Sequence, residues 1–143
     1  MTAFAISHVT FEDAGLLGSV LGERGVALRT CPAWDIPEAA DEAALLILLG
    51  GPISVNDTSD FPFLTKEISL ARARIAGGLP TIGICLGAQI MARAIGGAVG
   101  PGPEREIGWA PVNLTDAGRA SALAELDGVP VLHWHGEVCS LPE

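Results

Sequence analysis

Short apolar runs alternate with amphipathic stretches along most of this 143-residue chain. The runs predict strands at residues 4–9, 26–30, 45–49 and 81–84. Residues 45–49 are aliphatic throughout, which is typical of a strand buried on both faces of a parallel sheet. Strands that alternate with helices indicate an α/β fold with a mostly parallel sheet, and ligands of such sheets bind at the carboxyl ends of the strands.

The segments between these strands predict three helices. The first follows Thr10-Phe11-Glu12-Asp13, which offers a cap and an acidic first turn, and it ends at Gly25. Its apolar face is expected to hold Leu16, Leu17, Val20 and Leu21. The second begins at a cap on Asp60 and ends at Gly77-Gly78. Its apolar stripe is expected to hold Leu64, Ile68, Ala71 and Ile75. The third is expected over residues 86–95.

The last third of the sequence has a weaker pattern. Residues 107–115 predict one or two extended segments, residues 117–126 a weak helix, and residues 131–134 a final strand. Pro101-Gly102-Pro103 predicts a loop rather than a linker between cores. We therefore expect one domain over residues 1–143.

Composition narrows the class of protein. Hydrophobic residues make up 49% of the chain and charged residues 17%, which excludes intrinsic disorder. A net charge of −9 argues against a nucleic-acid partner. The apolar run at 43–49 is too short to span a membrane, and the N-terminus does not look like a signal peptide. Three cysteines without a CxxC motif favour a reducing, cytoplasmic compartment over a disulfide scaffold.

The segment Gly83-Ile84-Cys85-Leu86-Gly87 has the strongest chemical signal. It lies where a predicted strand gives way to a helix, in the pattern of a nucleophile elbow with cysteine as the nucleophile. Glycines are needed there because a sharp strand-to-helix turn brings neighbouring side chains together. Amide groups at the helix N-terminus favour a thiolate and can receive an oxyanion. We expect Cys31 and Cys139 to be buried core cysteines instead.

Four motifs follow one another along the chain, namely Leu48-Leu49-Gly50-Gly51-Pro52, Gly83-Ile84-Cys85-Leu86-Gly87-Ala88-Gln89, Glu106-Ile107-Gly108-Trp109 and His133-Trp134-His135-Gly136-Glu137. Together they resemble the class I glutamine amidotransferase domain, and in particular the stand-alone proteins similar to the glutaminase part of GMP synthase. The resemblance implies a flavodoxin-like three-layer α/β sandwich with a mostly parallel sheet.

The resemblance also implies a mechanism and a set of site residues. Cys85 would attack the side-chain amide of glutamine, ammonia would leave, and water would hydrolyse a glutamyl thioester. The backbone N–H groups of Gly51 and Leu86 would form the oxyanion hole. Gln89 and the main chain around His135-Gly136 would bind the substrate. From the residues alone, Gly51 also fits a plain strand-to-loop turn and Gln89 an exposed helix position.

The sequence departs from the family pattern at its end. The family places its catalytic His and its orienting Glu in a His-Pro-Glu segment, and this sequence stops at Leu141-Pro142-Glu143, before that segment. We therefore expect a C-terminally truncated domain with weak or absent glutaminase activity. Loss of the C-terminal elements would leave apolar sheet surface uncovered, unless the chain self-associates and so shields it. His133 and His135 alternate with Trp134, so both would point to one face and either could replace the base.

Other assignments remain open at this level. A non-catalytic binding or scaffold domain would keep the fold without the chemistry, and a different cysteine hydrolase would keep the elbow. A zinc site is a third alternative, with His133, His135, Glu137 and Cys139 as its ligands. Our expectation is that the chain uses no metal or cofactor.

The sequence also supports expectations for two tryptophans, for one acidic residue, and for the substrate and partner of the protein. We interpret Trp109 and Trp134 as core or rim packing, and Glu106 as either a solvated acid or a site residue. The expected substrate is glutamine. The sequence has no G-x-x-x-x-G-K loop, so an ammonia-using reaction would need a synthetase or acceptor domain.

Overall fold

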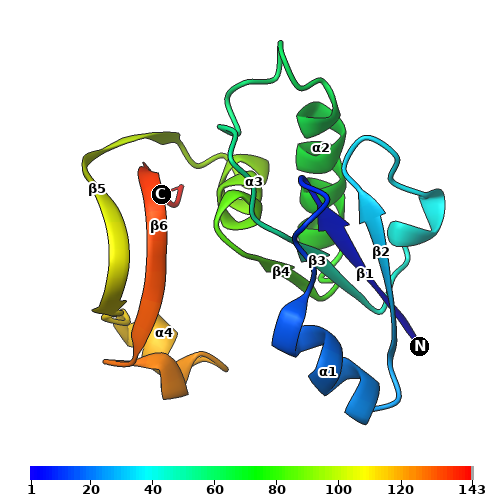
Figure 1. Ribbon diagram of the computed structural model, residues 1–143, viewed down its shortest axis with the longest axis horizontal. Helices are drawn as coiled ribbons and strands as arrows, with labels where there is room; N and C mark the ends of the chain where they lie inside the picture. Colours follow the sequence, from blue (N-terminus) through cyan, green and yellow to red (C-terminus); the bar gives the residue numbers. More distant parts are fainter. Residues whose placement is uncertain (143) are drawn as a thin grey trace. The chain divides into compact units, whose positions relative to one another are not determined.

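A four-stranded parallel sheet organises the N-terminal part of the chain, as the computed structural model shows for residues 1–142 (Figure 1). Its strands are β1 (Thr2–Ser7), β2 (Ala27–Pro32), β3 (Leu45–Leu48) and β4 (Thr81–Gly83). They lie in the order β2-β1-β3-β4, and every pair is parallel. The predicted α/β fold with a mostly parallel sheet is confirmed, and no end of these four strands is shifted by more than two residues.

Alternating side chains of β1 and β3 build two cores on opposite faces of the sheet. Phe4, Ile6 and Leu48 pack with α2 (Phe63–Ala76) and α3 (Leu86–Ala94) on one face. On the other face, α1 (Gly15–Glu23) packs its partly buried leucines against a smaller cluster that consists of Ala5, Ala14, Ile47 and Leu49. Figure 1 shows α1 on one side of the sheet and α2 and α3 on the other. Because successive strand residues point to opposite faces, both faces of β3 are buried, as its aliphatic run predicts.

The start of α1 differs from the sequence expectation. The helix begins at Gly15 with Ala14 at the N-cap and no acidic residue in its first turn. Asp13 instead accepts a hydrogen bond from the Gly15 amide at 2.7 Å. Leu16 is 79% exposed, so the apolar face is narrower than predicted. The reason is local: the polar loop continues past Thr10 to Asp13 before the helix can start.

Helix α2 confirms its predicted stripe but begins later than its predicted cap. Its N-cap is Pro62 rather than Asp60, and its C-cap is Gly77. Leu64 and Ala71 are fully buried. Arg74 is buried too and donates to the carbonyl groups of Ala40, Asp41, Ala43 and Pro80. Burial lowers the pKa of the Arg74 guanidinium, an effect that Asp41 opposes.

The remaining residues form a second compact unit over 101–137, while residues 1–100 and the C-terminal residues from Val138 form the first. In the second unit β5 (Val99–Pro111) pairs with β6 (Pro130–Cys139), and the two strands run in opposite directions (Figure 1). The loop predicted at residues 101–103 is wrong, because these residues lie within β5. Both strands are longer than predicted, since cross-strand pairing holds a Pro/Gly-rich segment that has little strand propensity of its own.

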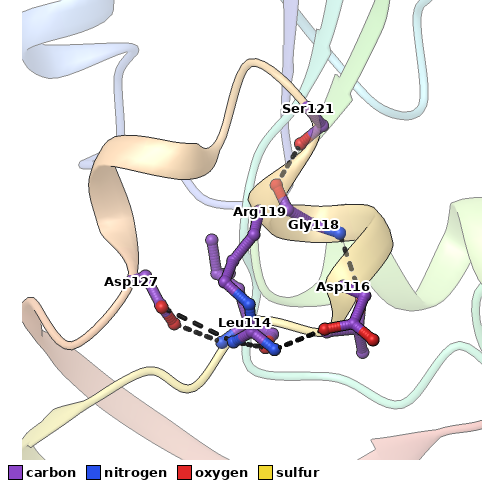
Figure 2. Close-up of polar contacts among 7 residues, drawn as sticks. Leu114, Asp116, Gly118, Arg119, Ser121 and Asp127 are labelled. Atoms are coloured by element: carbon purple, nitrogen blue, oxygen red, sulfur yellow. Dashed lines mark hydrogen bonds and ion pairs between the residues drawn. The ribbon is translucent and has the colours of Figure 1, made fainter.

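The predicted weak helix at 117–126 is two short pieces, α4 (Asp116–Arg119) and the 3₁₀ turn η2 (Ala124–Leu126). A further 3₁₀ turn, η1 (Glu38–Ala40), precedes β3. Figure 2 shows that Arg119 contacts two carboxylates of this region, with Nη2 at 2.8 Å from Asp116 and Nη1 at 3.5 Å from Asp127. Arg119 also donates to the Leu114 carbonyl. The contacts of Arg119 thus stabilise this segment, which does not form a continuous helix.

Apolar surface is exposed at the edge strand β4. Ile82 is 37% exposed and Ile84, which follows the strand, is 42% exposed. β4 pairs with β3 alone among the strands of residues 1–142. No helix within these residues is long and apolar enough to cross a membrane.

Candidate active site

Cys85 lies at a strained bend between β4 and α3. Its backbone has φ 54° and ψ −111°, and it is the only non-glycine residue with positive φ in residues 1–142. Such a conformation costs on the order of 1–3 kcal/mol and persists where the surrounding structure holds it. Cys85 is the N-cap residue of α3, and it is exposed rather than sunk in the core. The bend therefore presents the thiol at the start of a helix, as the motif predicts.

The two glycines of the bend have the steric role expected from the sequence. A Cβ at Gly83 would lie 2.5 Å from the carbonyl oxygen of Gly87. A Cβ at Gly87 would overlap the carbonyl oxygen of Leu48, at the end of β3. Any side chain at either position would push α3 away from the sheet. The close approach of α3 to β3 depends on both glycines.

The Gly50-Gly51 loop after β3 lies beside the bend. A Cβ at Gly50 would be 3.6 Å from the Cβ of Cys85. A Cβ at Gly51 would be 2.9 Å from both the Cβ of His8 and Cδ2 of Leu86. The structure thus brings together three sequence-predicted site residues, Gly51, Cys85 and Leu86, at the carboxyl edge of the sheet.

Leu86 and Gln89 are both on α3. The Leu86 N–H is in the first turn, where no earlier carbonyl of the helix can accept it. The backbone N–H of Gln89 donates to the Cys85 carbonyl at 3.1 Å, and the Gln89 residue as a whole is only 9% exposed. The alternative of an exposed helix position is therefore wrong for Gln89. A buried glutamine one turn after Cys85 remains a candidate for substrate binding.

The Gly50-Gly51 loop is held by a buried histidine, His8, that was not predicted from the sequence. His8 follows β1, and its Nδ1 donates to the Gly50 carbonyl at 2.8 Å. Its Nε2 lies 2.9 Å from Oε2 of Glu67, and both side chains are fully buried. The signal that could have found His8 is its place directly after a strand, at the edge where Gly50 and Cys85 also lie.

The charges around His8 favour its protonated form. Burial lowers the pKa of His8, but the hydrogen bond and charge of Glu67, the Gly50 carbonyl and the charge of Glu12 together raise it above its ordinary value. The other carboxylate oxygen of Glu67, Oε1, is buried without a hydrogen-bond partner among the described residues. The buried pair thus anchors the loop beside Cys85, and it is an ion pair when His8 is protonated.

His135 and Gly136, the other predicted substrate-binding residues, are on β6 in the second unit. Nε2 of His135 lies 2.9 Å from Oε2 of Glu106, and Nδ1 of His133 lies 4.0 Å from the same oxygen. His133 and His135 therefore share one face of β6, as their spacing predicts. Glu106 is a member of a histidine cluster rather than an isolated solvated acid.

The structure narrows or corrects expectations for several other side chains. Trp109 and Trp134 are 74% and 69% exposed, which excludes core packing and leaves rim packing as the prediction for both. Cys139 is exposed, because it ends a strand of a two-stranded sheet. Cys31 is buried as predicted, and burial, with the charges of Glu67 and Asp35, raises the pKa of its thiol.

The zinc ligand set suggested by the sequence is also corrected. In residues 1–142 the group with metal-ligand geometry consists of Glu106, His133 and His135, without Glu137 or Cys139. The carboxylate of this group is on β5, which pairs with β6 but lies far from it in sequence.

Comparisons with known proteins identify the family and the fold. The family model for glutamine amidotransferase class-I matches residues 16–143. The chain is 33% identical over 151 residues to the glutamine amidotransferase-like protein YfeJ of Salmonella typhimurium, covering all of the chain and 63% of YfeJ. It is 37% identical over 101 residues to GMP synthase [glutamine-hydrolyzing] of Streptomyces avermitilis, covering 71% of the chain and 18% of that protein.

A solved structure gives the same result for the fold. A glutamine amidotransferase from Thermotoga maritima matches with a TM-score of 0.80 and 29% identity, over 99% of this chain and 63% of that one. The chain belongs to the class I glutamine amidotransferase family. It spans less than two thirds of the length of YfeJ and of the Thermotoga protein.

Proposed function

We propose that this chain carries the glutamine-binding and nucleophilic part of a glutaminase, with Cys85 as the nucleophile. The Cys85 thiolate would attack the side-chain amide carbon of glutamine, the C–N bond would break, and ammonia would leave. Water would then hydrolyse the thioester to glutamate and restore the thiol. The observation that carries this proposal is the strained, exposed Cys85 beside two backbone segments that contain N–H donors.

Those donors are the amides of Gly51 and Leu86, which we infer to be the oxyanion hole. Their two residues are in contact, since a Cβ at Gly51 would be 2.9 Å from the Leu86 side chain. Removing one such donor typically costs about 10²–10³ in kcat. Gln89 is the remaining substrate-binding residue of the proposal in the first unit; the role of the His135-Gly136 main chain, in the second unit, stays a prediction from the family resemblance.

The departing ammonia needs a proton donor, typically worth about 10²–10⁴ in rate. His8 does not suit this role, because its ring is fully buried against Glu67 and Gly50. His133 and His135 have partly exposed rings. Ammonia release by this chain, measured beside a version extended through a downstream His-Pro-Glu segment, tests where the donor lies.

We also infer a partner that consumes the ammonia. The similarity to GMP synthase of Streptomyces avermitilis supports a synthetase domain in that role. We also propose a cytoplasmic location, because three cysteines without a CxxC motif favour a reducing compartment.

Alkylation by a glutamine-mimicking electrophile at neutral pH tests the nucleophile directly. Cys139 is the matched control because it too is exposed. We expect Cys85 to react at least tenfold faster than Cys139, with protection by added glutamine and no such phase in Cys85→Ala. Equal rates at the two cysteines, without protection, would refute the proposal and favour a binding or scaffold domain on the same fold.

A further inference from the structure

Three side chains of β5 and β6 bring one possible ligand atom each to the same place. Oε2 of Glu106 lies 2.9 Å from Nε2 of His135 and 4.0 Å from Nδ1 of His133. The two imidazole rings are tilted, with centroids 5.9 Å apart. One ligand atom from each residue lies within 4.8 Å of the others. All three residues belong to the second unit.

Backbone carbonyls determine which ring nitrogens carry the hydrogens. Nδ1 of His135 lies 3.1 Å from the Glu137 carbonyl oxygen, and Nε2 of His133 lies 3.1 Å from the Ala110 carbonyl oxygen. A carbonyl oxygen only accepts, so these two nitrogens must donate. When both rings are neutral, the opposite nitrogen of each is a lone pair that faces Glu106. Three acceptors then converge, and either a proton on one ring or a metal ion between the three atoms removes their repulsion.

We propose that Glu106, His133 and His135 form a binding site for a divalent transition-metal ion, with zinc as the representative. Two imidazoles and a carboxylate suit zinc and its neighbours, whereas calcium and magnesium prefer oxygen ligands alone. The hydrogen bonds from the distal nitrogens to backbone carbonyls are the arrangement that metal-bound histidines usually have.

Tetrahedral ligands at about 2.0–2.1 Å from zinc are roughly 3.3 Å apart. The two separations from Glu106, 2.9 Å and 4.0 Å, lie on either side of that value, and the two histidine nitrogens are within 4.8 Å of each other, so the side chains must move closer to hold the ion. The three side chains are 18–51% exposed, so they can rotate by that amount without disturbing a core. Three protein ligands leave a fourth position for water or a small ligand.

The ion would link β5 to β6 across the hairpin. Glu106 and His133 are separated by a long loop that contains α4 and η2, and the ion would close that loop in the folded state only. Zinc should therefore raise the unfolding temperature of the protein. This inference does not depend on the glutaminase proposal, since its readout is metal binding.

Zinc titration of the untagged, chelator-treated chain tests the site by calorimetry, with metal analysis after dialysis. We expect about one zinc per chain and a loss of affinity of roughly tenfold or more in Glu106→Gln and in His133→Gln. Glu137→Gln and Cys139→Ser are the matched controls, because they alter the other two candidate ligands on β6. Both controls should keep the affinity of the parent chain.

Three results would overturn the proposal: no zinc binding by the parent chain, unchanged binding in both ligand variants, or loss of binding in Cys139→Ser. If a ligand variant fails to fold, nitrogen NMR of the parent chain decides the question. Zinc should shift Nδ1 of His133 and Nε2 of His135, while the other two ring nitrogens keep their hydrogens. Shifts at the opposite nitrogens, or none, would also refute the site.

Discussion

Two histidine–carboxylate contacts in this protein have the same length in different surroundings. Nε2 of His8 lies 2.9 Å from Glu67 in the first unit, and Nε2 of His135 lies 2.9 Å from Glu106 in the second. The first pair is fully buried, whereas the side chains of the second are 28% and 51% exposed. Water screens the His135–Glu106 pair and leaves it accessible to ligands. The His8–Glu67 pair is out of reach of solvent, so its role is to stabilise the residues around it. Distance alone therefore does not tell what such a pair does.

The largest effect is expected from breaking the buried pair. Glu67→Ala should lower the free energy of unfolding by about 3–5 kcal/mol, because it leaves His8 buried without its partner. Urea unfolding of the parent chain and the variant measures the difference. A loss below about 1 kcal/mol would mean that water reaches His8, and the contrast between the two pairs would disappear.

The buried pair should also make stability depend on pH. The pKa of His8 is raised above 6.5, so its contribution is fully present below pH 6.5 and is lost as pH rises through the raised value. Urea unfolding between pH 6.5 and 9.0 should show a fall in the parent chain that is reduced in His8→Gln. Above 9.0 the buried Cys31 thiol adds a loss of its own. Identical pH profiles in both proteins would contradict the raised pKa of His8.

The third prediction concerns the backbone strain at Cys85, which the first unit maintains. In the second unit, positive φ values occur only at Gly108 and Gly128, whereas Cys85 has φ 54° with a side chain. Cys85→Gly should be more stable than Cys85→Ala by about 1 kcal/mol, because relief of strain outweighs the entropy cost of glycine. Thermal unfolding of the two variants measures this. An alanine variant as stable as the glycine variant would show that the bend is not strained.

The smallest effect is expected at the exposed pair. In metal-free buffer, Glu106→Gln should change the free energy of unfolding by no more than about 1 kcal/mol, since solvent screens the contact. Added salt should reduce the difference further. Unfolding curves at low and high salt measure both. A loss as large as that of Glu67→Ala would place the second pair in the same class as the first.

The fold was predictable where the pattern is local. The aliphatic run of β3 predicts burial on both faces, and Leu64 and Ala71 predict the buried stripe of α2. Strand β5 was less predictable, because Pro101 and Gly102 have weak strand propensity and only pairing with β6 extends them.

The site was predictable in part. The motif around Cys85 predicts the bend and its glycines, whereas a site role for Gly51 came only from the family resemblance. The supporting pair was missed because His8 and Glu67 are 59 residues apart and neither belongs to a motif. Glu106 was left open because its contact with His135 depends on the register of β5 against β6.

The sequence by itself determined the strained turn at Cys85, because the need for Gly83 and Gly87 arises from atoms of the turn and of the strand beside it. Only the tertiary structure decided which charged groups meet, since Glu67 and Glu106 could each face solvent in an isolated helix or strand. Burial then separated the two pairs: desolvation with compensating charge made the first an internal support, and partial exposure made the second a site open to a cation.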